Sequence, residues 1–376
     1  MFDLAIRNGT LVTADRVFGG HLYVRNGTIA AISDDGTLPA REELDAAGLY
    51  VLPGMLDCHA HINDPGFTWR EDLPHASEAA AVGGVTTLID MPLQNTPAAF
   101  ANKRAVFEGR SLVDYAFWGG LVTDNTAELA GMDEAGAVGF KAFIAPVSLG
   151  YSSVDMGLAR EALFRIKGFG GLAGFHCEDH ALICAGEAKA KAVGGTRRAF
   201  LDSRPVVAEL IATANVIELA RETGARVHIC HVSHPRVAEL VRRARAEGLP
   251  VTGETCPHYL VFTEENLLSG GTAFKCAPPL RPAEARDGLW EYVLDGTLSC
   301  IGSDHSPART DEKDEAIHGV MGAWGGLSGL QSLVQVMFDQ AVTRRGCSPS
   351  LLARFAASAA ELFGLDDRTT SPTKRR

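Results

Sequence analysis

Three features are missing from the sequence, and each absence argues against a class of protein. No apolar stretch reaches the roughly 18 residues that a membrane-spanning helix needs, and no signal-type apolar core follows Met1. None of the eight cysteines falls in a C-x-x-C pair, so we expect buried, reduced thiols. The net charge of −11 contains no long like-charged run, which makes nucleic acid and anionic membranes poor partners. We therefore expect a cytoplasmic protein.

The first 50 residues predict a small β-module. Short apolar runs alternate there with the turn signals Asn8-Gly9 and Asn26-Gly27. Such spacing is typical of small antiparallel strands that are joined by tight turns. We expect a compact β-sandwich-type module at residues 1–50.

After Pro53-Gly54 the pattern changes to apolar β-type runs that are separated by helical stretches. The runs lie at residues 51–57, 85–91, 115–121, 138–144, 171–175, 226–230, 249–253 and 298–303. Eight strands with helices between them predict an α/β fold, a (β/α)8 barrel of the TIM type, over residues 51–365. The polar tail at residues 366–376 follows the last helical run, and we expect it to be disordered.

The predicted strands carry ligand-type side chains at their ends, where the active site of such a barrel lies. These residues are His59, His61, Lys141, His176, His231 and Asp304. His59 and His61 are two residues apart on a strand, so both imidazoles face the same side and can hold one metal ion. Lys141 lies among large apolar residues, which disfavour an unpaired ammonium group. Five of the eight predicted strands therefore contribute a candidate ligand to one rim.

Each of these residues has an ordinary structural interpretation when it is taken alone. A single histidine in an apolar run is more often a hydrogen-bonded core residue, and a buried lysine is more often half of an ion pair. Asp304 alone could be a helix cap. The coincidence of five strand ends favours a metal site. His75, His228, His234, His258 and His305 are less well placed, and we interpret them as structural or supporting groups, with His258 and His305 the nearest to being exceptions.

The chemistry of this residue set points to two divalent metal ions. Two cations about 3.5–4 Å apart can share one hydroxide and polarise a carbonyl oxygen. Carbon dioxide converts a lysine amine into a carbamate whose two oxygens can bridge both ions, so we predict a carboxylated Lys141. One ion is assigned to His59, His61 and Asp304, the other to His176 and His231, and Lys141 joins them. Asp304 is the predicted catalytic proton carrier. Zinc is the first expectation, and iron, cobalt, nickel and manganese also suit such ligands.

Several longer motifs resemble the cyclic amidohydrolase branch of the amidohydrolase superfamily over about residues 50–365. They are His59-Ala60-His61-Ile62-Asn63-Asp64-Pro65-Gly66, Gly83-Gly84-Val85-Thr86-Thr87, Asp90-Met91-Pro92-Leu93, Gly139-Phe140-Lys141, Cys256-Pro257-His258-Tyr259, Lys275-Cys276-Ala277-Pro278-Pro279-Leu280-Arg281, Ser303-Asp304-His305-Ser306-Pro307 and Ala323-Trp324-Gly325-Gly326-Leu327. The resemblance implies the six metal ligands named above. It also implies hydrolysis of an amide bond in a hydantoin-like ring, with allantoin opened to allantoate by a metal-bridging hydroxide.

Other members of this branch remain alternatives. Dihydroorotases carry an arginine where this chain has Asn63 and a histidine where it has Ala308, and hydantoinases and dihydropyrimidinases carry a tyrosine where it has Pro146. Asn63 and Asn95 are candidates for hydrogen bonds to a neutral polar ring, although either could cap a local turn. A catalytically silent scaffold is a further alternative, but it would have lost ligands, and none is lost here.

The resemblance also carries expectations about the ends of the chain and about assembly. Relatives return after the last helix to add strands to the N-terminal β-module, and we expect this chain to lack those strands. Unpaired strand edges invite association, which makes a destabilised module another possible outcome. Relatives commonly form tetramers, so we expect a homo-oligomer.

Overall fold

The computed structural model describes residues 1–91, 94–147 and 151–365. The predicted tail at residues 366–376 lies outside these ranges, as do Pro92 and Leu93 of one motif. The chain divides into two compact units. One contains Met1–Leu56 and the segment that begins at Val334, and the other contains Asp57–Leu333. The boundaries expected at residues 50 and 365 remain predictions.

The first unit contains a five-stranded mixed sheet and the last helices of the chain. Its strands are β1 (Phe2–Val12), β2 (Val17–Arg25), β3 (Thr28–Ser33), β4 (Ala40–Asp45) and β5 (Tyr50–Val51). The sheet has the order β3-β2-β1-β4, and β5 also pairs with β1. The helices are α13 (Leu333–Phe338), the π-helical turn Asp339–Thr343 and α14 (Ser350–Leu362). The Tyr50 and Phe338 rings, 5.6 Å apart, connect the sheet to this helical segment.

The two Asn-Gly pairs of the module have different roles. Asn26 and Gly27 both have positive φ and form the tight turn between β2 and β3, as predicted. Asn8-Gly9 does not form a turn but lies inside β1, where the register with β2 shifts between Ile6 and Gly9. A positive φ at Asn8 accommodates this bulge. The prediction of antiparallel strands holds for β1, β2 and β3, whereas β4 and β5 pair with β1 in parallel.

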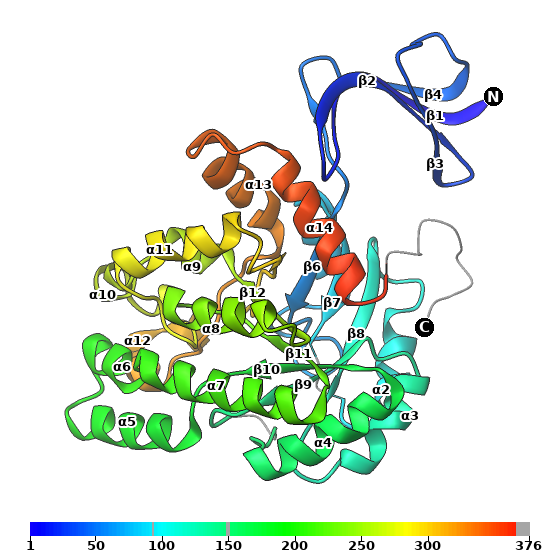
Figure 1. The fold of residues 1–376 in the computed structure, drawn as a ribbon. Coiled ribbons are helices and arrows are strands. Elements are labelled where there is room, and N and C mark those ends of the chain that lie inside the picture. Colours follow the sequence, from blue (N-terminus) through cyan, green and yellow to red (C-terminus); the bar gives the residue numbers. More distant parts are fainter. Residues whose placement is uncertain (92–93, 148–150, 366–376) are drawn as a thin grey trace. The chain divides into compact units, whose positions relative to one another are not determined.

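The second unit is built on eight parallel strands (Figure 1). They are β6 (Met55–Ala60), β7 (Val85–Asp90), β8 (Asp114–Gly120), β9 (Gly139–Phe143), β10 (Leu172–His176), β11 (Arg226–Ile229), β12 (Val251–Thr255) and β13 (Cys300–Ile301). Each overlaps one of the predicted apolar runs, although β6 shares only residues 55–57 with the run predicted at residues 51–57. A parallel bridge between Ala60 and His305 brings the segment after β13 next to β6, so the two edges of the sheet meet. The predicted (β/α)8 architecture is confirmed.

Helices follow the strands and surround them in Figure 1. They are α1 (Leu73–Val82), α2 (Pro97–Phe107), α3 (Leu129–Glu134), α4 (Met156–Phe169), α5 (His180–Ala192), α6 (Arg197–Ser203), α7 (Val206–Thr223), α8 (Pro235–Ala246), α9 (Pro257–Val261), α10 (Glu264–Gly270), α11 (Ala283–Leu294) and α12 (Glu315–Gly322). Many begin with a capping side chain. Asp72, Thr96, Asp155 and Asp179 each accept a hydrogen bond from a backbone N–H in the first turn. No helix of the described chain has the length and apolar character needed to cross a bilayer.

A fully buried tryptophan on β8 contacts three other strands of the barrel. Trp118 on β8 is fully buried, and its Nε1 donates to the carbonyl oxygen of Cys58 on β6 at 3.2 Å. The ring lies against Gly139 and Gly174 on the two following strands, where an added Cβ would approach it to 2.6 and 2.7 Å. The glycines at these two positions therefore make room for the indole.

We expect Gly174→Ala to destabilise the protein by about 1–3 kcal/mol, because a methyl group overpacks the site against the Trp118 ring. Gly168→Ala is the matched control, since Gly168 lies inside α4 with nothing within 4 Å of an added Cβ. This change should stabilise the helix by about 0.5–1 kcal/mol. Urea unfolding of both variants measures the difference, and equal stabilities would contradict the packing role of Trp118.

The cysteines mostly follow the expectation of buried thiols. All eight are free, and six are buried, but Cys184 is exposed on α5 and Cys347 is partly exposed. These two lie in helical and loop segments away from the barrel strands. The prediction was therefore wrong for the burial of Cys184.

Candidate metal and active site

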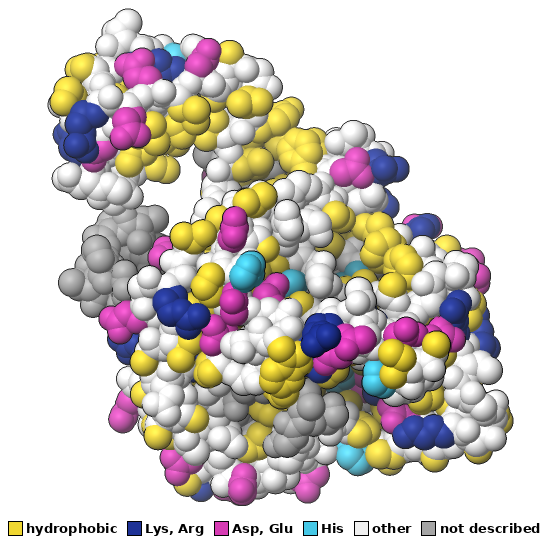
Figure 2. Space-filling model, turned by 180° about the vertical axis from the view of Figure 1, so that it is seen from behind, with side chains coloured by type: hydrophobic (Ala, Val, Ile, Leu, Met, Phe, Trp, Pro, Cys, Tyr) yellow, Lys and Arg dark blue, Asp and Glu magenta, His cyan; other side chains and the backbone are white. Residues whose placement is uncertain are grey.

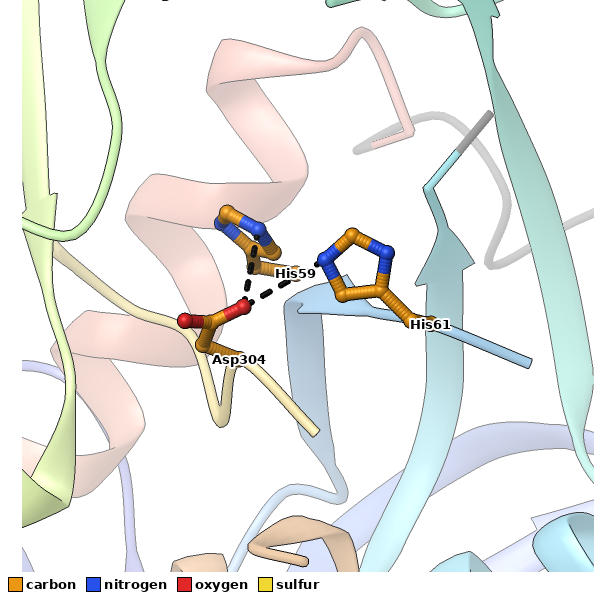
Figure 3. A group of neighbouring side chains, drawn as sticks. All are labelled: His59, His61 and Asp304. Carbon is orange, nitrogen blue, oxygen red and sulfur yellow. Dashed lines mark ion pairs between the residues drawn. The ribbon is translucent and has the colours of Figure 1, made fainter. Parts of the chain in front are cut away.

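Three predicted ligands converge at the junction of the first and last strands (Figure 3). Oδ1 of Asp304 lies 3.2 Å from Nε2 of His59 and 3.4 Å from Nε2 of His61. The ligand atoms of these residues lie close enough together to hold one metal ion. The structure thus brings His59, His61 and Asp304 together as the sequence predicted.

The other predicted ligands extend this group along the rim. The ring centroids of His59 and His231 are 5.3 Å apart, and those of His231 and His176 are 4.6 Å apart. With His61, whose centroid is 5.4 Å from that of His59, they form a row of four imidazoles. Lys141 lines the same pocket as these residues. All six predicted ligands therefore face one cavity.

Lys141 is the least ordinary of these groups. It is fully buried, and its Nζ has no hydrogen-bond partner within the described chain. Its amine lies 5.3 Å from the Phe143 ring centroid, and none of the ion pairs among the described residues involves it. Burying a polar group without a partner is costly. Lys141 therefore stands out as a group that lines the pocket and is paired with nothing among the described residues.

Two of the candidate ligands adopt left-handed backbone conformations. His231 has φ of 40° and Asp304 has φ of 46°. Such conformations are uncommon for residues other than glycine, and they gather at functional sites where the surrounding structure enforces them. His231 follows the end of β11 by two residues, and Asp304 follows the end of β13 by three. In these backbone conformations both side chains line the pocket.

The electrostatics of the site favour neutral imidazoles around an ionised carboxylate. Burial lowers the pKa of His59 to about 4. Burial also lowers the pKa of His176 and, to a greater extent, that of His231. Burial alone would raise the pKa of Asp304, but the surrounding histidines hold it well below its usual range. Neutral imidazole and ionised carboxylate are the forms that bind metal ions.

Hydrogen bonds tie β6 to the segment that carries Asp304. Asp57 Oδ1 accepts from the backbone N–H of His59 at 3.1 Å and from that of Ser303 at 2.9 Å. Ser303 Oγ donates to the His59 carbonyl oxygen, and His61 N donates to the His305 carbonyl oxygen at 2.7 Å. These bonds fix the relative positions of the histidine pair and the aspartate.

Two buried acids that the sequence reasoning did not identify hold the backs of the ligand histidines. Glu254 on β12 accepts a short hydrogen bond from Nδ1 of His59, which leaves Nε2 facing the pocket. Its Oε1 also accepts from the backbone N–H of His231 at 3.2 Å. Glu178, just after β10, is 2.7 Å from Nε2 of His176. Their local sequence does not single them out, since Glu178 follows the end of β10 and Glu254 lies between Gly253 and Thr255 on β12.

The remaining predicted residues are placed less uniformly. Asn63 is buried and lines the pocket. Asn95 does not appear in the pocket wall, and its carbonyl oxygen accepts from Nδ2 of Asn125. Nε2 of His305 lies 2.8 Å from Oε2 of Glu71. A ring nitrogen of His258 lies within 4.8 Å of a carboxylate oxygen of Asp304.

Several pocket residues come from loops and were not predicted as site residues. Tyr151, Trp324, Arg70 and Arg204 line the cavity. Arg70 lies 3.8 Å from the Trp324 ring centroid and donates to Glu312, so two loops form one wall. Tyr151 has a buried hydroxyl group without a hydrogen-bond partner among the described residues.

The pattern of the Amidohydrolase family matches residues 50–371, which include all six candidate ligands. The chain belongs to the amidohydrolase family. Its similarity extends to allantoinase of Escherichia coli K12, which is 40% identical over 98% of this chain and 83% of that protein. The resemblance to the cyclic amidohydrolase branch is thereby confirmed.

Solved structures agree with this assignment of the amidohydrolase. The L-hydantoinase (dihydropyrimidinase) from Arthrobacter aurescens superposes with a TM-score of 0.94 at 35% identity, covering 97% of this chain and 83% of that chain. The dihydropyrimidinase from Brevibacillus agri gives a TM-score of 0.90 at 28% identity, covering 97% and 82% of the two chains. The amidohydrolase is therefore a hydrolase of cyclic amides, with residue groups that suit divalent metal ions.

Proposed function

We propose that this amidohydrolase opens the hydantoin ring of allantoin to give allantoate. The observation that carries the proposal is the convergence of six ligand-type side chains on one pocket, with the unpaired amine of Lys141 among them. The similarity to allantoinase over nearly the whole chain supports this substrate within the class of cyclic ureides.

The proposed centre uses the residues predicted from the sequence. His59, His61 and Asp304 would hold one divalent ion, His176 and His231 would hold the second, and a carbamate on Lys141 would join them. The residues fit this assignment because the buried Nζ of Lys141 and the buried Nδ1 of His231 have no hydrogen-bond partner among the described residues. Carboxylation converts the amine into an anion, which removes the cost of a buried, unpaired cation. When bound, a metal pair activates a shared water and polarises the scissile carbonyl.

Asp304 is proposed to move the proton in this reaction. Its carboxylate lies at the pocket beside His59 and His61, where it would accept a proton from the attacking water. The new bond joins the water oxygen to the amide carbon. As the carbon–nitrogen bond breaks, Asp304 delivers the proton to the departing nitrogen. Asn63, in the pocket wall, is proposed to bind the polar ring through its amide group.

Hydrolysis of dihydropyrimidines or of other hydantoins is the second candidate function. The absence of a tyrosine at position 146 argued against it, but Tyr151 enters the same pocket from further along the loop. The pocket wall also contains Phe67, Met91 and Phe143, which suit an apolar ring substituent. The solved hydantoinase structures support the same alternative.

A substrate panel on zinc-loaded, bicarbonate-treated protein tests the proposal. We expect the highest kcat/KM for allantoin and lower values for hydantoin and dihydrouracil. Dihydroorotate should not be hydrolysed above background, because this chain has Asn63 where dihydroorotases carry an arginine. Highest activity on hydantoin or dihydrouracil would favour the second candidate. No turnover of any ureide or hydantoin would contradict both.

Finer properties of the proposed enzyme follow from the same family relationship. We propose zinc as the metal, a homotetramer as the assembly and the cytoplasm as the location. Metal analysis of protein purified without added metal, and light scattering of the same sample, measure the first two. Iron, cobalt, nickel or manganese in the purified protein would revise the metal, and a monomer would contradict the assembly.

A further inference from the structure

A buried chain of charged side chains lies behind one side of the site. Glu178 is fully buried, and Oε2 of its carboxylate lies 2.7 Å from Nε2 of His176. The same oxygen accepts a short hydrogen bond from Nη1 of Arg204, whose Nη2 donates to Glu187 on α5 at 3.0 Å. His176 is thus hydrogen-bonded to an acid whose charge is balanced by one arginine.

The arginine in this chain is itself held in place from behind. Nη1 of Arg281 donates to the Arg204 carbonyl oxygen at 2.7 Å, and Nε of Arg281 donates to Ser233 Oγ at 2.9 Å. Glu209 on α7 binds both Arg281 and the backbone N–H of Ser233. Ser233 lies two residues after His231, so the network that supports Arg204 also fixes the loop that follows His231.

The hydrogen bond to Glu178 decides which nitrogen of His176 is available. With Nε2 engaged by the carboxylate, only Nδ1 remains to coordinate a metal ion. A carboxylate behind a ligand histidine fixes its tautomer and ring orientation and raises its basicity. His59 has a different acid behind it, Glu254, so the two proposed metal positions do not share this support.

We propose that Glu178, held by Arg204, is a positioning residue that acts on the second metal ion through His176. The inference rests on the proposed assignment of His176 and His231 to that ion. The two metal ions should therefore differ in how they respond to the loss of Glu178. The second ion should bind more weakly, and the ion at His59, His61 and Asp304 should bind as before.

The test is a zinc titration against a chromogenic chelator, with Glu178→Gln as the main variant. Glutamine keeps the shape of the side chain but removes the charge, and we expect one of two zinc equivalents to bind about 10- to 100-fold more weakly. Glu187→Gln is the matched control, because it removes an acid from the same arginine without contact to His176. This control should bind both equivalents as the parent protein does.

Glu178→Asp keeps the proposal testable if the glutamine variant does not fold. Aspartate retains the charge opposite Arg204 but withdraws the carboxylate from His176 by one methylene group, so the second equivalent should still weaken. The proposal would be overturned if a folded variant bound both zinc equivalents with the affinities of the parent protein. It would also be overturned if the variant bound both equivalents more weakly by the same factor. The titration needs no substrate, so its outcome is independent of whether allantoin is hydrolysed.

Discussion

Replacing Lys141 with methionine is expected to reduce hydrolysis of cyclic ureides by about 10³-fold or more, since a metal pair contributes several kcal/mol to the transition state. Methionine fills the buried space of the lysine but cannot take up carbon dioxide. The same change should stabilise or leave unchanged the metal-free protein, because it removes a buried amine that has no partner among the described residues. Steady-state kinetics and thermal unfolding of the metal-free variant measure the two effects.

Lys167→Met is the control for this variant, because Lys167 lies on the exposed side of α4. It should retain full activity and bind both metal ions. Removing bicarbonate from metal-depleted parent protein should reproduce part of the Lys141→Met defect, and restoring metal together with bicarbonate should reverse it. Undiminished activity of Lys141→Met would show that the bridging role of this residue is wrong.

Replacing Lys103 with methionine is expected to destabilise the protein by about 3–5 kcal/mol, the cost of leaving one partner of a buried ion pair uncompensated. Lys103 on α2 and Asp90 at the end of β7 form a short ion pair, and both are almost completely buried. Burial raises the pKa of Asp90, and Lys103 opposes this effect. Asp90 Oδ1 also accepts the backbone N–H of Ile62, between His61 and Asn63, at 2.8 Å.

A double variant separates the buried charge from the lost packing. In Asp90→Asn with Lys103→Met, the asparagine carbonyl can still accept from Ile62, and no unpaired charge remains. We expect this protein to recover more than half of the stability that Lys103→Met loses, as measured by urea unfolding. A double variant as unstable as the single one would place the cost in packing around α2 instead.

Much of the barrel was predictable because its strands are buried on both faces. Such strands appear in the sequence as continuous apolar runs, and all eight were located this way. The carboxyl ends of parallel barrel strands meet at one rim. His59, Lys141 and Asp304 could therefore be placed at the same rim from their positions at strand ends, although they are far apart along the chain.

Features that depend on tertiary pairing were not predictable in the same way. Glu254 supports His59 through a hydrogen bond between strands that are far apart in the sequence, and no local pattern predicts that contact. Tyr151 and Trp324 reach the pocket from loops, whose paths periodicity does not determine. Asn8-Gly9 carries the same signal as Asn26-Gly27, yet only pairing with the neighbouring strand shows that it forms a bulge.

The β-module exposes several large apolar side chains whose exposure the sequence pattern did not predict. Figure 2 shows apolar side chains gathered on this module, and Ile29, Ile32, Leu44 and Leu49 are each about half exposed or more. Alternation of apolar and polar residues predicted strands here correctly. It gave no indication of which apolar side chains the sheet would leave uncovered.

The Trp118 indole has a consequence for how the strands of the barrel depend on one another. It is fully buried on β8, its Nε1 donates to Cys58 on β6, and its ring lies against glycines of β9 and β10. One side chain thus links the strand that carries His59 to the strands that carry Lys141 and His176. A smaller ring at position 118 is therefore expected to disturb these three residues together.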